Sequence, residues 1–88
     1  MNWTVNISRE AAKHMRRLPG DRRDQLSRAF EGMGLDPLQG DVVPIKSGKF
    51  KGALRKRVGR YRIIFVLDSS NRQVEIGAVL TRSEKTYQ

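Results

Sequence analysis

The clearest pattern of apolar and polar positions lies in residues 52–67, GALRKRVGRYRIIFVL, where two β-prone runs flank one glycine. The runs predict two antiparallel strands. Gly59-Arg60 fits the centre of a two-residue type II′ turn, because glycine accepts a positive φ. With this turn, Arg57 lies opposite Arg62 on the neighbouring strand. Because side chains alternate between the faces of a strand, the turn also fixes which residues share a face.

The two faces of this predicted hairpin differ in polarity. One face carries Arg55, Arg57 and Arg62, which we call the arginine cluster, beside the aliphatic residues Ile64 and Val66. The other face is apolar apart from Lys56, and its apolar members are Leu54, Val58, Tyr61, Ile63, Phe65 and Leu67. Opposed like charges destabilise a pair of strands. The arginine cluster therefore favours a binding site for a polyanion, such as a phosphate backbone, over a solvated basic face.

The N-terminal part of the chain predicts one strand and a helical hairpin. Residues 3–7 alternate apolar and polar, which is typical of a half-buried strand. Ser8 is the predicted N-cap of a first helix that Pro19-Gly20 ends, and Asp21 is the predicted N-cap of a second helix. Gly34 fits a left-handed C-terminal residue of that second helix. The apolar positions of the two helices are Ala11, Ala12, Met15, Leu18, Leu26, Ala29, Phe30 and Met33.

Two further predicted strands complete the pattern. Val42-Val43 predicts a short strand that Pro44 confines to a sheet edge, because proline lacks the N–H needed in a central strand. Residues 74–80 predict the last strand, and Gly77 within it indicates a bulge. The predicted fold is α+β: an N-terminal strand, a helical hairpin and a mainly antiparallel sheet of three to four further strands. The helices should cover the apolar face of the hairpin and leave the arginine cluster open.

Composition narrows the function classes. The 88 residues form a single domain, 1–88, and they include no cysteine and one histidine, His14, so we expect no metal site and no cofactor. The net charge of +9 predicts an acidic partner, either nucleic acid or an acidic protein. The N-terminus lacks the apolar segment of a signal peptide, and no run is long enough to span a bilayer. We therefore expect a cytoplasmic protein that does not bind membranes.

The order of these elements resembles the RelE/ParE toxin superfamily over nearly the whole chain. Short motifs add to the resemblance: DP at 36–37, GD at 40–41, LRKRVG at 54–59, YRI at 61–63, and the late pair Arg82 and Tyr87. The resemblance implies the toxin of a type II toxin–antitoxin pair, inhibited by an antitoxin protein. RelE-like members cleave mRNA in the ribosomal A site. ParE-like members inhibit DNA gyrase and are not nucleases.

The resemblance also implies site residues. Arg62 matches the arginine that contacts the scissile phosphate, and the other implied catalytic residues are Arg55, Arg82 and Tyr87. The chain departs from the family at Ala53, where strong nucleases often carry lysine, and at Thr81, where many members carry histidine. The spacing from Arg82 to Tyr87 is also one residue longer than usual. The loss of the lysine favours the ParE-like alternative.

The chemistry of metal-independent RNA cleavage leaves few candidates for the general base. The base must take the proton of the 2′-OH, and cations must stabilise the charge on the phosphorane. Arginine is always protonated, so Tyr87 or a lysine must be the base. The candidate lysines are Lys49, Lys51 and Lys56, and together with Arg57 they are also the predicted RNA-binding residues. We expect a ribosome-dependent mRNA endonuclease; the alternatives are a gyrase inhibitor and a basic RNA-binding module without catalysis.

Overall fold

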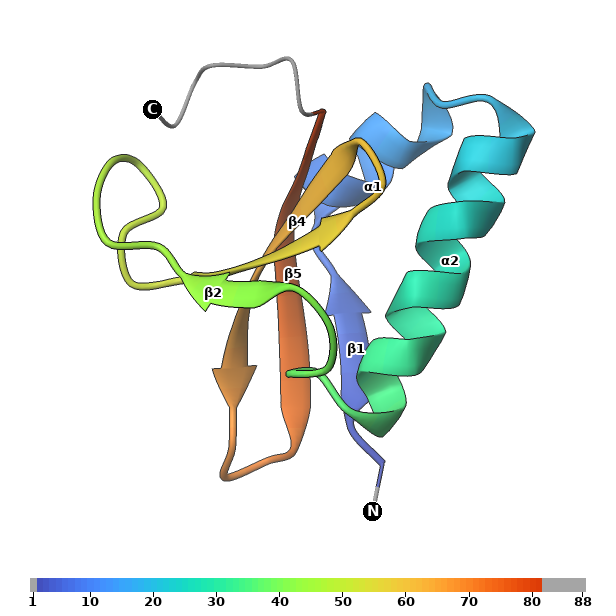
Figure 1. The fold of residues 1–88 in the computed structure, drawn as a ribbon. Coiled ribbons are helices and arrows are strands. Elements are labelled where there is room, and N and C mark those ends of the chain that lie inside the picture. The colour runs from blue at the N-terminus through green and yellow to red at the C-terminus, as the bar shows by residue number, and fades with distance from the viewer. Residues whose placement is uncertain (1, 82–88) are drawn as a thin grey trace.

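Two helices lie on one face of a five-stranded sheet in the computed structural model, which describes residues 2–81 (Figure 1). The elements are β1 (Thr4–Ile7), α1 (Arg9–Arg16), α2 (Gly20–Leu35), β2 (Val42–Pro44), β3 (Leu54–Val58), β4 (Tyr61–Asp68) and β5 (Gln73–Thr81). The strand order is β1-β5-β4-β3-β2. β1 pairs with β5 in parallel, and the other neighbouring strands are antiparallel. The predicted α+β fold is confirmed.

Helix α1 begins where the sequence predicts. The Ser8 hydroxyl accepts a hydrogen bond from the Ala11 N–H at 3.1 Å, which satisfies a backbone donor that has no partner within the helix. The same hydroxyl donates to the Gly77 carbonyl at 2.9 Å. Ser8 therefore caps α1 and also ties its start to β5.

The start of α2 differs from the prediction. Pro19, in an extended conformation, is the N-cap, and its carbonyl accepts hydrogen bonds from the N–H groups of Arg22 and Arg23 at 3.0 Å each. Asp21 lies within the first turn and does not cap the helix. The prediction failed because the proline carbonyl begins the hydrogen-bond ladder before Asp21. At its actual position the Asp21 carboxylate still interacts favourably with the helix dipole.

The end of α2 also differs from the prediction. Gly34 has no positive φ and lies inside the helix, which continues to Leu35. Asp36 is extended, as a residue before proline prefers to be. The Gly34 carbonyl accepts a hydrogen bond from the Trp3 N–H at 2.6 Å, and a Cβ at Gly34 would lie 3.3 Å from the Trp3 carbonyl oxygen. A side chain at this position would therefore require the two backbones to move apart by a few tenths of an ångström.

The central hairpin has the predicted register. Val58 pairs with Tyr61, and Arg57 pairs with Arg62. Gly59 has a φ of 58°, whereas Arg60 does not have a positive φ, as a type II′ turn requires. The register, and with it the assignment of side chains to faces, is confirmed.

The bulge in β5 and the edge position of β2 are also confirmed. Along the β4–β5 pair, Ile64 lies opposite Ala78 and Phe65 lies opposite Ile76, so Gly77 is left unpaired. β2 pairs only with β3 and forms one edge of the sheet, which accommodates Pro44.

The hydrophobic core lies between the helices and the sheet. The two helices contribute Ala11, Leu26, Phe30 and Met33, and the strands contribute Tyr61, Ile63, Phe65, Val74, Ile76 and Val79. Leu54, Val58 and Leu67 pack against this cluster. The predicted apolar face of the hairpin therefore meets the helices.

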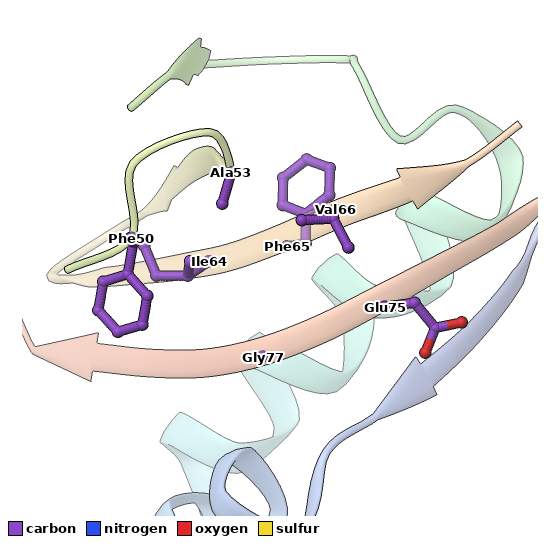
Figure 2. A pocket seen from close by; sticks show the side chains of 7 residues that line it. All are labelled: Phe50, Ala53, Ile64, Phe65, Val66, Glu75 and Gly77. Atoms are coloured by element: carbon purple, nitrogen blue, oxygen red, sulfur yellow. The ribbon is translucent and has the colours of Figure 1, made fainter. Parts of the chain in front are cut away.

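The opposite face of the sheet is less open than expected. Ile64 points to that face and is only 2% exposed. The loop between β2 and β3 brings Phe50 and Ala53 close to it (Figure 2). This loop is closed by two backbone hydrogen bonds, from the Ile45 N–H to the Ala53 carbonyl at 2.9 Å and from the Gly52 N–H to the Ile45 carbonyl at 3.0 Å. The loop therefore covers part of the face that carries the arginine cluster.

Candidate functional site

The arginine cluster lies on the face of the sheet opposite the helices. Arg55 and Arg57 are two residues apart on β3, and Arg62 lies directly opposite Arg57 on β4. The side chain of Arg57 is 42% exposed, whereas that of Arg55 is only 15% exposed. Within the cluster, the Arg55 side chain is therefore mostly covered, whereas the Arg57 side chain is accessible to a ligand.

A carboxylate that sequence analysis did not assign to the site lies between two of these arginines. Asp41 Oδ1 is 3.5 Å from Arg55 Nη2, and Asp41 Oδ2 is 3.7 Å from Arg57 Nε. The Asp41 carbonyl also accepts a hydrogen bond from the Arg57 N–H at 3.0 Å, which fixes the start of β2 beside β3. Like-charge repulsion within the cluster is thus offset by an internal anion.

Asp41 does not satisfy all of the donors of Arg55. Within residues 2–81, Arg55 Nη1 is buried and has no hydrogen-bond partner. A buried donor without a partner is unfavourable, more so when the group is charged. The guanidinium of Arg55 therefore has a donor that Asp41 leaves unsatisfied.

The three candidate lysines do not lie together. Lys49 and Lys51 are exposed in the β2–β3 loop, and Lys49 Nζ lies 5.6 Å from the centre of the Phe50 ring. Lys56 points to the helix side of the sheet, and its ammonium donates to the Gln39 carbonyl at 2.6 Å. The structure therefore separates Lys56 from the arginine cluster.

A small apolar pocket lies on the same face as the arginine cluster. Its volume is about 200 Å³, and it is lined by Phe50, Ala53, Ile64, Phe65, Val66, Glu75 and Gly77 (Figure 2). Ile64, which lines the pocket, is the cross-strand partner of Arg55. Glu75 accepts a hydrogen bond from Asn6 Nδ2 at 2.9 Å. The face thus combines guanidinium groups with an adjoining apolar hollow, an arrangement that suits a ligand with both anionic and apolar parts.

Solved structures match this chain at sequence identities of 24% or less. No protein-family model matches the sequence, and no curated protein matches it. A chain of the archaeal RelE–RelB complex from Pyrococcus horikoshii OT3 superposes with a TM-score of 0.81 at 19% identity, covering 97% of this chain and 100% of that one. A chain of the RelBE2 toxin–antitoxin complex from Mycobacterium tuberculosis gives a TM-score of 0.81 at 24% identity, covering 93% and 100%. The chain has the RelE fold.

A further toxin structure also matches this chain. The YoeB/ParE toxin from Agrobacterium tumefaciens matches with a TM-score of 0.72 at 12% identity, and the match covers 89% of this chain and 96% of that one. The resemblance inferred from the sequence motifs is therefore confirmed at the level of the RelE fold.

Arg82 and Tyr87, two of the site residues that the sequence resemblance implies, lie outside the described residues. In the described part, Leu80 on β5 is the cross-strand neighbour of Arg62. Residues 2–81 contain no group of three or more side chains suited to hold a metal ion. Neither α1 nor α2 has the length and hydrophobicity of a membrane span.

Proposed function

We propose that this protein is the toxin of a type II toxin–antitoxin pair and that it cleaves mRNA on the ribosome. The observation that carries the proposal is the arginine cluster, with Arg57 and Arg62 directly opposed on one face of the sheet. This face already holds one carboxylate, that of Asp41, at 3.5 Å from Arg55 and 3.7 Å from Arg57, so its guanidinium groups are placed to bind an anion such as a phosphate. The similar structures named above are toxins or come from toxin–antitoxin complexes, which supports the same role.

The proposed reaction is cleavage of an RNA phosphodiester bond by its neighbouring 2′-OH. A base takes the proton, the 2′-oxygen attacks phosphorus, and the 5′-oxygen leaves with a proton, giving a cyclic phosphate and a 5′-hydroxyl end. Arg62 stabilises the charge that grows on the phosphorane, while Arg55 and Arg57 bind phosphate oxygens. These roles need only permanent cations, which guanidinium groups provide.

The general base of this reaction is Tyr87 or a lysine. Lys56 is the weakest candidate, because its ammonium is bound to the Gln39 carbonyl on the helix side. Lys49 and Lys51 belong to the β2–β3 loop, which lies over the same face as the arginines. A base of this kind is poorly matched to neutral pH, so we expect slow cleavage of free RNA. Positioning on the ribosome would then supply much of the rate.

The proposed partner protein is an acidic antitoxin. The net charge of +9 attracts an acidic chain, and the arginine cluster offers guanidinium groups for its carboxylates. An antitoxin bound there would block the approach of RNA to the same residues.

One observation favours a ParE-like gyrase inhibitor as the second candidate. Ala53 stands where strong nucleases of the superfamily often carry lysine, and it lines the apolar pocket. An apolar hollow beside arginines also suits a protein surface, because interfaces commonly combine apolar contacts with arginine. In this alternative the arginine cluster binds protein carboxylates instead of RNA.

Mapping of RNA 5′ ends in cells after induction separates the two candidates. The proposed function predicts new 5′-hydroxyl ends at in-frame codons of translated mRNA, and the same cells should lose these ends when they express Arg62→Ala. Chromosome breakage without new RNA ends would contradict the nuclease proposal and support gyrase inhibition.

A further inference from the structure

The Asp41 carboxylate holds two members of the arginine cluster in a way that leaves it exchangeable. Its distances of 3.5 Å to Arg55 and 3.7 Å to Arg57 are long compared with the 2.7–2.9 Å typical of tight charge-assisted hydrogen bonds. The Asp41 side chain is 50% exposed, so it can be hydrated when it leaves the arginines. Both ion pairs are therefore weak contacts that a better anion can replace.

The backbone around Asp41 can stay in place during such an exchange. The Asp41 carbonyl accepts the Arg57 N–H at 3.0 Å, and Val42 pairs with Lys56 in the sheet. Rotation of the Asp41 side chain alone would therefore break both ion pairs. Arg55 Nη1, which has no partner within residues 2–81, shows that one carboxylate does not saturate the donors.

We infer that the Asp41 carboxylate is an internal ligand of the arginine cluster. It occupies the place beside Arg55 and Arg57 where an anion binds, until a phosphate group displaces it. The identification of RNA phosphate as the displacing group rests on the function proposed above. Asp41 keeps the two guanidinium groups at one position while no ligand is bound. It also lowers the affinity for small anions, because each must compete with the carboxylate. A polyanion that makes several contacts overcomes this competition, so Asp41 increases the preference for extended anionic ligands.

Inorganic pyrophosphate is a suitable probe, because its binding does not depend on RNA cleavage. Isothermal titration calorimetry of the Asp41→Asn protein should give about threefold to tenfold tighter binding than the parent, because the substitution removes two ion pairs, each of which shifts an equilibrium by about 1.4-fold to fivefold. Asp24→Asn is the matched control: it changes the net charge equally, at an exposed position of α2. Its effect should stay below about twofold, because salt screens distant charges. Asp41→Glu keeps the carboxylate and should restore an affinity close to that of the parent.

Side-chain NMR adds a test of the local contact between Asp41 and Arg57, which does not depend on the net charge of the protein. In the parent, pyrophosphate should move the Arg57 Nε–H signal away from its Asp41-paired position, and Asp41→Asn should move that signal without any ligand. An affinity for Asp41→Asn that equals that of Asp24→Asn, or is weaker than that of the parent, would overturn the inference. Absence of pyrophosphate binding to both parent and Asp41→Asn would overturn it too. If Asp41→Asn binds pyrophosphate more tightly but the parent does not cleave mRNA, the displacement of Asp41 by phosphate is supported. The proposed function would then be rejected.

Discussion

Arg62 occupies a position that the sheet alone does not favour. It lies on β4 opposite Arg57 on one side and Leu80 on the other. A charged residue flanked in this way contributes less to strand stability than a β-branched or aromatic one. Its place opposite Arg57 makes Arg62 part of the arginine cluster, where it is available to an anionic ligand.

Replacement of Arg62 should separate stability from activity. Arg62→Ala removes like-charge repulsion with Arg57, so the melting temperature should hold or rise slightly. Arg62→Lys keeps one charge and loses the bidentate fork, so it should recover only part of the toxicity. Thermal melting and growth assays measure the two effects. Lost toxicity together with a clearly lowered melting temperature would make Arg62 a structural residue.

Two glycines of α2 allow a matched comparison at the residue scale. Gly32 has nothing within 4 Å of an added Cβ, whereas a Cβ at Gly34 would lie 3.3 Å from the Trp3 carbonyl oxygen. Gly32→Ala should stabilise by about 0.5–1 kcal/mol through helix propensity. Gly34→Ala should destabilise, because two backbones would have to separate. Chemical denaturation measures both, and equal stability of the two variants would contradict the close contact.

At the scale of elements, local patterns of the sequence were sufficient to predict the structure wherever a single turn or helix cap determines it. The β3–β4 register followed from Gly59 and the alternation of side chains, and the start of α1 followed from Ser8. The role of Gly34 was not predictable, because it depends on a contact with Trp3, which precedes both helices and is remote from Gly34 in the sequence. Asp41 was missed for a similar reason. Its contact with the arginines depends on how a long loop aligns β2 with β3, which local propensity does not encode.

The tight turn between β3 and β4 depends on the glycine at position 59. Gly59 has a φ of 58°, and an added Cβ would lie 2.8 Å from Gln25 Nε2. Gly59→Val should lower the free energy of unfolding by about 1–3 kcal/mol, mainly through backbone strain. For a domain of this size, that is a fall in melting temperature of at least about 4 °C. An unchanged melting temperature would show that the turn tolerates a side chain.

At the scale of the whole molecule, charge should govern the rate of binding to the antitoxin. The chain carries 18 Lys and Arg residues against 9 Asp and Glu residues, so its field attracts an acidic partner over long distances. Exposed charges are screened over about 10 Å at 0.1 M salt, so the association rate should fall by about tenfold or more as salt rises to about 0.5 M. Stopped-flow mixing with the antitoxin measures this rate. A rate that does not change with salt would exclude electrostatic steering.

The central claim is that the arginine cluster stabilises a phosphorane during RNA cleavage. The most direct measurement is the single-turnover rate of mRNA cleavage on purified ribosomes that hold a defined codon in the A site, compared between the parent and Arg62→Ala. Loss of one such electrostatic contact typically lowers the rate by about 10²–10³. We predict a decrease of this size in a variant that melts at or above the parental temperature. A folded Arg62→Ala protein that cleaves at the parental rate, or a parent that does not cleave at all, would contradict the account.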